Sequence, residues 1–272
     1  MTTAQHRRAL YVLIALLALT ATLGCSISSF GLERVSVGAL RSESTSVERE
    51  DAEHVRATIS MGAGELDVRR GTDALMAADF TYNVAAWRPE VSYSVADGQG
   101  RLTVRQPNTE QISIRGSTRQ EWDIRLNDEV PLDLRIEAGA GRQELDLAGL
   151  QLTTLDVKLG AGSATVNVSD NALLTRLDLD MGAGDVEIDL DGPWAQDADI
   201  RIQGGVGEVT LRLPRDTGVR VTVTRGIGEV NTTDLRRDGS NVYVNAAYGE
   251  SDVTLDVNIR AGVGRVTLDV SN

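Results

Sequence analysis

The sequence predicts an all-β fold, a solenoid-like stack of short strands that is capped at both ends. Three observations predict it: a Gly-x-Gly motif recurs along the chain, apolar and polar residues alternate on both sides of the motif, and helical spacing is missing from these segments. A repeat of fixed length is typical of stacked arrays, and a period of two residues is typical of strands.

The Gly-x-Gly motifs define the repeat. The four central spacings between successive motifs are 21, 22, 23 and 21 residues, so each repeat would form one coil made of two short strands. At the bend between them the chain needs positive φ, and a side chain would meet the same position in the next coil. The residue between the glycines is expected to point inward as a small plug. The predicted corner residues are Gly62, Gly64, Gly139, Gly141, Gly160, Gly162, Gly182, Gly184, Gly205, Gly207, Gly226, Gly228, Gly262 and Gly264.

The alternation around the motif at 182–184 separates an apolar face from an acidic one. Its apolar members are Leu177, Leu179, Met181, Val186, Ile188 and Leu190. We interpret the acidic face as a solvated surface that opposes edge-to-edge pairing. Weak binding of a divalent cation to Asp178, Asp180, Asp189 and Asp191 is the alternative. The third glycine and the helix of a dinucleotide fingerprint are missing, so we predict no cofactor and no metal.

The first residues predict export. Residues 1–24 combine two arginines, an apolar run and small residues, as signal peptides do. Cys25 is the only cysteine, and the Leu-Gly before it resembles a bacterial lipobox, although Thr22 departs from the pattern. We therefore predict lipidation of Cys25 and attachment to a membrane through the lipid. An ordinary signal peptide is the alternative. Residues 25–51 are predicted to form a flexible tether.

Two β regions are expected after the tether: an N-terminal region at 52–133 and a repeat domain at 134–272. The N-terminal region holds most of the aromatic residues, which would seal one end of the stack as a cap. Alternatively, Trp87 and Trp122 could contact a sugar or peptide ligand. The spacing of 36 residues between the last two motifs predicts an inserted hairpin or loop at 236–245 as the second cap.

Composition argues against most catalytic classes. After residues 1–24, His54 is the only histidine, so serine triads and histidine-rich zinc sites are excluded. A formal net charge of −13 opposes binding to nucleic acid. Paired carboxylates of a glycan hydrolase are the remaining catalytic alternative, but no pair is marked above the others. We predict a protein that is not an enzyme.

The segments "EWDIRLNDEVPLDLRIEAGAG", "RLDLDMGAGDVEIDL" and "VRATISMGAGELDVRRG" resemble the bacterial toast-rack family. They are also similar to the C-terminal domain of cell-wall-active antibiotic response proteins and to adhesin-like domains with stacked Gly-x-Gly strands. The resemblance implies a β-solenoid-like domain at the cell envelope without a known active site. We therefore expect a lipid-anchored interaction or adhesin-like scaffold whose partner is an envelope protein or a cell-wall component. An accessory sensor of envelope stress is the alternative.

Overall fold

The computed structural model describes residues 34–107 and 113–271. Within these ranges the chain forms strands and one short 3₁₀ turn, η1 (Ala85–Trp87). One compact unit holds the described residues 36–107 and 115–271. The short strands β1 (Arg34–Ser36) and β7 (Ser113–Arg115) pair as a sheet of their own. The predicted signal peptide and Cys25 lie outside the described residues. None of the described residues forms a helix long and apolar enough to cross a bilayer.

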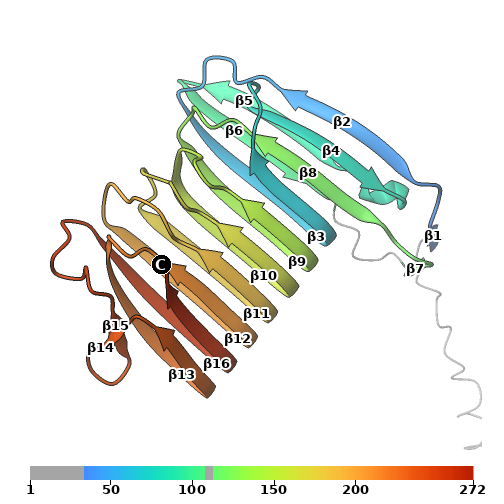
Figure 1. The fold of residues 1–272 in the computed structure, drawn as a ribbon. Helices are drawn as coiled ribbons and strands as arrows, with labels where there is room; N and C mark the ends of the chain where they lie inside the picture. The colour runs from blue at the N-terminus through green and yellow to red at the C-terminus, as the bar shows by residue number, and fades with distance from the viewer. Residues whose placement is uncertain (1–33, 108–112, 272) are drawn as a thin grey trace, which may run out of the picture. The chain divides into compact units, whose positions relative to one another are not determined.

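Seven long strands form the centre of the compact unit, and all are parallel (Figure 1). Each carries one Gly-x-Gly motif, and the motifs stand in register across the sheet. The predicted all-β, solenoid-like fold is confirmed. The two short strands expected in each coil form one continuous strand, because ladder pairing resumes on both sides of the motif. These strands are β3 (His54–Arg70), β9 (Leu132–Asp146), β10 (Leu152–Asn167), β11 (Arg176–Asp189), β12 (Ala198–Leu213), β13 (Gly218–Thr233) and β16 (Thr254–Val270).

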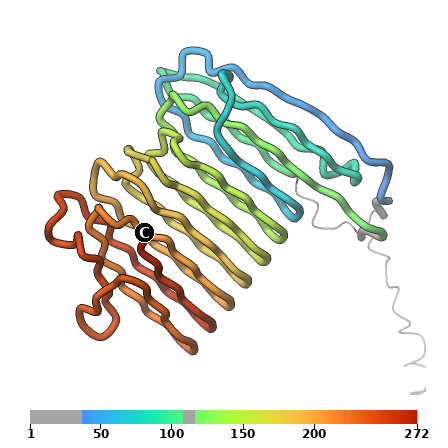
Figure 2. The backbone as a smooth tube through the Cα atoms, viewed as in Figure 1, coloured from blue at the N-terminus to red at the C-terminus, as the bar shows by residue number. Residues whose placement is uncertain are grey.

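Each long strand is divided by its glycines into a first arm and a second arm, and we call the bend between them the corner. The tube of each coil folds back at one common edge of the stack (Figure 2). In β11, Leu177, Leu179 and Met181 are buried before the corner, and Val186 and Ile188 are buried after it. The buried positions are odd-numbered up to Met181 and even-numbered from Val186 onward, so the alternation of buried and exposed side chains shifts by one residue at the corner. Both arms thereby turn their apolar side chains into one shared core.

The strand order differs from the sequence order at the C-terminal end. The last strand, β16, lies between β12 and β13 and pairs in parallel with both. The expectation that successive coils stack in chain order is therefore wrong at this point. The hairpin formed by β14 (Arg236–Arg237) and β15 (Val242–Val244) carries the chain back, and β15 pairs with the first arm of β13. This is the hairpin that the sequence predicts as the second cap.

At the N-terminal end the two arms of β3 continue as separate strands. The first arm pairs with β6 (Gln99–Arg105), which pairs with β5 (Glu90–Ala96). The second arm pairs with β8 (Gln120–Leu126), followed by β4 (Met76–Tyr82) and β2 (Arg41–Val47). The predicted boundary at 133/134 falls inside β9, within one continuous sheet.

Strand β2 corrects the predicted tether. Residues 41–47 were expected to be flexible, yet they form the outermost strand of the second arm. The segment is polar, and its stability comes from ladder hydrogen bonds to β4 and from side-chain contacts. The hydroxyl of Ser44 donates to Asp79 at 2.6 Å, and Glu43 accepts from Tyr82 at 2.7 Å and from Arg88 at 2.9 Å. Backbone pairing allows a strand without an apolar face, which hydrophobic periodicity cannot detect.

Candidate functional site

The corner glycines face the backbone of the neighbouring coil. A Cβ atom at Gly139 would overlap the carbonyl oxygen of Gly62, and one at Gly141 would overlap that of Gly64. The same overlap recurs at both glycines of every later motif. The second glycine of each motif also has a φ between 125° and 150°, which residues with a side chain rarely adopt. The stacking of backbone on backbone and the conformation therefore both require glycine.

The first glycine of the stack has different surroundings. A Cβ at Gly62 would meet only the side chain of Gln106, at 3.2 Å. The backbone N–H of Gly62 donates to Oε1 of Gln106 at 2.9 Å. The carbonyl oxygen of Gly62 faces Gly139 in the next coil, whereas no corner precedes Gly62 in the described stack, and its N–H therefore uses a side-chain acceptor. Gln106 thereby closes the N-terminal end of the corner.

The residues between the glycines form an exposed row, which we call the ridge. The sequence predicted that they point inward, and this is wrong: Val206 is 57% exposed, Val263 47% and Ile227 75%. The backbone of the two glycines already fills the inside of the bend, so the side chain between them points outward. The ridge changes from alanine to larger apolar residues toward the C-terminal end. Its members are Ala63, Ala140, Ala161, Ala183, Val206, Val263 and Ile227.

A shallow groove runs beside the ridge across all seven long strands, and we call it the corner groove. The first glycine of every motif after Gly62 lines its floor, together with the residue that precedes each first glycine. A row of polar side chains on the first arms forms the wall opposite the ridge. Gln203 donates to Asp180 at 2.6 Å within this wall. The wall residues are Ser60, Glu137, Lys158, Asp180, Gln203, Arg260 and Thr224. Lys158 and Arg260 occupy the same position of the repeat and were not predicted as site residues.

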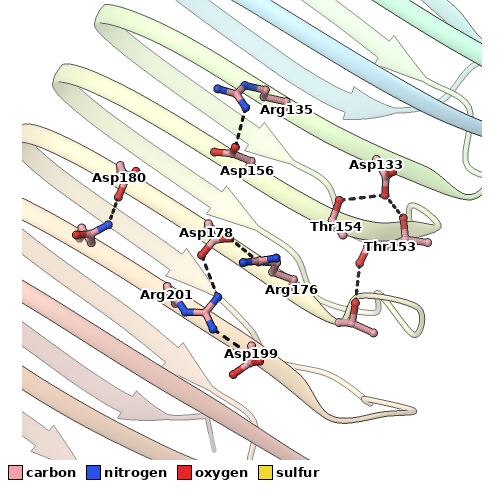
Figure 3. Close-up of polar contacts among 12 residues, drawn as sticks. Asp133, Arg135, Thr153, Thr154, Asp156, Arg176, Asp178, Asp180, Asp199 and Arg201 are labelled. Carbon is pink, nitrogen blue, oxygen red and sulfur yellow. Dashed lines mark hydrogen bonds and ion pairs between the residues drawn. The ribbon is translucent and has the colours of Figure 1, made fainter.

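Ion pairs connect neighbouring strands on the outer faces of the arms (Figure 3). Arg135 contacts Asp156 at 3.2 Å on the next strand, and Asp178 lies between Arg176 at 2.8 Å and Arg201 at 3.5 Å. The predicted acidic ladder is thus interleaved with arginines. Among the described residues no group of three or more acidic, histidine or cysteine side chains is placed to hold a metal ion.

Asp133, at the start of β9, is the centre of a polar cluster. It accepts hydrogen bonds from Thr153 at 2.6 Å and Thr154 at 3.0 Å, with Arg56 at 3.4 Å and His54 at 3.8 Å. Burial raises the pKa of Asp133, but the threonine hydroxyls and the contacts with His54 and Arg56 outweigh it, so the pKa is lowered. The threonine hydroxyls donate to the carboxylate and not to the histidine. This geometry stabilises the carboxylate and does not activate a nucleophile.

The two tryptophans predicted as ligand contacts lie in different environments. Trp122 is 1% exposed and packs edge-to-face on Phe80, with ring centroids 5.3 Å apart. The prediction is corrected for Trp122, because its indole is part of the core at the N-terminal end. Trp87 is half-buried in η1, and its carbonyl oxygen accepts from Nε2 of Gln120 at 3.3 Å. A ligand contact through Trp87 stays a prediction.

Comparison with protein families now assigns the fold. Residues 36–173 and 170–212 match the model of the N-terminal domain of toast_rack. The chain belongs to the toast-rack family. Its structure is similar to that of a proposed cell adhesion protein from Clostridium sporogenes, with 30% identity and a TM-score of 0.68, covering 86% of this chain and all of that one.

A more distant similarity connects this toast-rack chain to a proposed adhesin from Bacteroides fragilis. The identity is 11% and the TM-score 0.30, covering 86% of this chain and 99% of that one. No curated protein matches the chain significantly.

Proposed function

We propose that this toast-rack protein is a non-catalytic, adhesin-like scaffold at the cell envelope, and that its corner groove binds an extended chain of a cell-wall component. The observation that carries the proposal is the groove itself, which crosses seven strands in one direction. The similarity to a proposed cell adhesion protein at 30% identity supports the same class of function.

The geometry of the groove favours a long, repetitive ligand. Neighbouring strands in a sheet lie about 4.8 Å apart, so seven strands offer a straight track of about 29 Å. Equivalent backbone groups recur at each step along it. The floor is made of glycine backbone and of apolar side chains such as Leu159 and Met181. The wall alternates in charge through Glu137, Lys158 and Asp180 before reaching Arg260. A linear polymer with regularly spaced polar groups can contact such a track at several successive coils.

Attachment to a membrane through Cys25 is the second part of the proposal. The lipobox-like Leu-Gly directly before Cys25 supports it. Replacing the cysteine in Cys25→Ser should release the chain from the membrane fraction of the producing cells. Retention of the variant in that fraction would contradict lipid anchoring and leave the groove proposal untouched.

Co-sedimentation with insoluble peptidoglycan sacculi tests the groove. We expect the wild-type chain to sediment with the sacculi and the double variant Ala161→Arg with Ala183→Arg to lose most of this binding. Both alanines are exposed on the ridge, so arginines there can fold outward and obstruct the groove.

A matched control is Thr165→Arg with Thr210→Arg, on the outer face of the second arms and away from the groove. The control should sediment as the wild type does. Equal loss in both double variants would show that binding depends on overall charge. Failure of the wild type to sediment would reject peptidoglycan as the component.

A further inference from the structure

We propose that copies of this chain associate head to tail, with the edge of β2 in one copy adding in parallel to the second arm of β13 in the next. The strand order, the strand directions and the register carry this inference. It does not depend on what the corner groove binds.

The second arm of β13 is an open sheet edge. Among the described residues, β16 pairs with one side of it and no strand pairs with the other, whereas β15 covers the first arm. Seven of the eight residues at 226–233 are exposed. Their sequence, GIGEVNTT, is rich in β-branched residues and has none of the lysines or prolines that protect many natural edges. Such an edge is a template for an incoming strand.

The two ends of the stack are stepped in opposite directions. At the N-terminal end the second arm extends beyond β3 by three strands, β8, β4 and β2, and the first arm by two, β6 and β5. At the C-terminal end the first arm extends beyond β13 by β15 and the two-residue β14, and the second arm has no further described strand. The longer second arm of one copy therefore leaves room beside its first arm for β15 of the next copy, with the two-residue β14 at the boundary to β5.

Strand direction agrees with this arrangement. Strand β2 is antiparallel to β4, β4 is antiparallel to β8, and β8 is parallel to β3. Strand β2 therefore runs in the same direction as the second arm of β13. Pairing two β13 edges about a two-fold axis would instead drive the hairpin of each copy into the first arm of the other. The favoured association is heterologous and extends without closing.

The register supplies complementary partners. Ser42 stands in the same row across the sheet as Glu65, and this row ends at Glu229 on β13. If the next copy continues the rows without a shift, Ser42 lies beside Glu229 and Arg41 beside Gly228. The Ser42 hydroxyl can then donate to the Glu229 carboxylate, and Arg41, whose side chain alternates to the opposite face of β2, lies beside the backbone of Gly228.

The remaining outward positions of the two edges are uncharged. Ser44 and Ser46 of β2 would face Asn231 and Thr233 of β13 in the same register. Hydroxyl and amide groups can hydrogen-bond across such a seam without burying a charge. Although each copy carries a strong negative charge, the seam itself holds no repelling pair.

Sedimentation velocity of the purified full chain over a range of concentrations tests the proposal. We expect the average mass of the wild type to rise with concentration and to pass beyond a dimer. A variant blocked at the N-terminal end, Arg41→Glu with Ser46→Lys, should stay monomeric. So should a variant blocked at the C-terminal end, Asn231→Lys with Thr232→Lys. All four residues are exposed, so the core is unchanged. The control Thr165→Lys should associate like the wild type.

Mixing the two blocked variants distinguishes head-to-tail association from other kinds. Each variant keeps one intact edge, so an equimolar mixture should form dimers and nothing larger. A wild type that stays monomeric at every concentration overturns the proposal. It is also overturned by a wild type that stops at the dimer, by blocked variants that still associate, or by a control that fails to associate. Thermal unfolding of each variant confirms that it is folded.

Discussion

The two ends of the stack are finished in different ways. At the N-terminal end both arms of β3 are covered by further strands, Gln106 caps the amide of Gly62, and Trp122 and Phe80 fill the core. At the C-terminal end β15 covers only the first arm of β13, and the second arm is left exposed. A stack needs caps because its last coil exposes both backbone and core. The corner and the core are therefore closed at the N-terminal end, where the outer edges of β2 and β5 have no strand partner among the described residues, whereas the C-terminal end leaves half of its last long strand uncovered.

The direction in which the carbonyl groups of the corner glycines point explains why the two ends need different caps. The carbonyl oxygen of each corner glycine faces the next coil of the stack wherever a further coil follows, and a Cβ on any corner glycine except Gly62 would meet neighbouring backbone. At the C-terminal end the last carbonyls have no further coil to face, and the guanidinium of Arg225 donates to the oxygen of Gly228. The closed end requires an acceptor side chain and the open end a donor.

The largest expected effect comes from substituting the corner glycines. Gly182→Val or Gly205→Val places a side chain against the carbonyl of the preceding coil, and we expect each to destabilise the fold by more than about 4 kcal/mol. Thermal unfolding measures this as a large fall in melting temperature. Full stability in both variants would contradict the stacked-corner account.

A matched pair of alanine substitutions sharpens the comparison of the ends. Gly139→Ala meets the backbone of Gly62, whereas Gly62→Ala meets only the flexible side chain of Gln106. We expect Gly139→Ala to cost several kcal/mol and Gly62→Ala about 1 kcal/mol or less. Equal losses of unfolding free energy in a denaturant titration would show that the direction of the corners is not the cause.

The next largest effect concerns the aromatic residues of the closed end. Trp122→Ala leaves a cavity beside Phe80 in the core and should lower the unfolding free energy by about 3–5 kcal/mol. Trp87→Ala removes a half-buried side chain and should cost about 1 kcal/mol. Urea unfolding of both variants checks this order. A larger loss in Trp87→Ala would reverse the assignment of Trp122 as the core residue.

The smallest expected effect is the contribution of Asp133, near the N-terminal end of the stack, to the pH dependence of the unfolding free energy. Because its pKa is lowered in the folded protein, its ionised form stabilises the fold above the pKa of an unfolded aspartate, about 4. This stability is lost as the pH falls through the lower folded pKa. Asp133→Asn should remove about 1 kcal/mol at neutral pH and show a shallower loss in acid. Urea unfolding at a series of pH values measures it, and identical acid slopes for both chains would contradict this role.

Much of this architecture could be predicted from sequence because it is encoded locally. The alternation around Gly182 predicts both arms of β11, and the motif spacing predicts the stack and the hairpin at 236–245. The position of β16 between β12 and β13 could not be predicted, because the choice between two parallel neighbours depends on long-range pairing. The sequence of β2 lacks an apolar face, so its pairing with β4 gives no periodic signal.

The candidate site was predicted only in part. The glycines that form the floor of the corner groove were recognised, but the direction of the ridge side chains was not, since it depends on how the backbone turns inside the bend. The change from Ala183 to Val206 and Ile227 along the ridge is visible in the sequence and could have indicated exposure, because an inward plug would keep one size. The ligand contact through Trp122 was kept as an alternative to the cap because composition alone does not distinguish a buried aromatic residue from an exposed one.

Amide hydrogen exchange tests the contrast between the two ends most directly. In dilute protein, where copies are separate, we expect slow exchange in both arms of β3 and in the first arm of β13 at 218–224. We expect faster exchange in the second arm at 226–233, because its amides that face away from β16 have no strand partner among the described residues. Protection of 226–233 equal to that of 218–224 under these conditions would contradict the claim that the C-terminal end is half open.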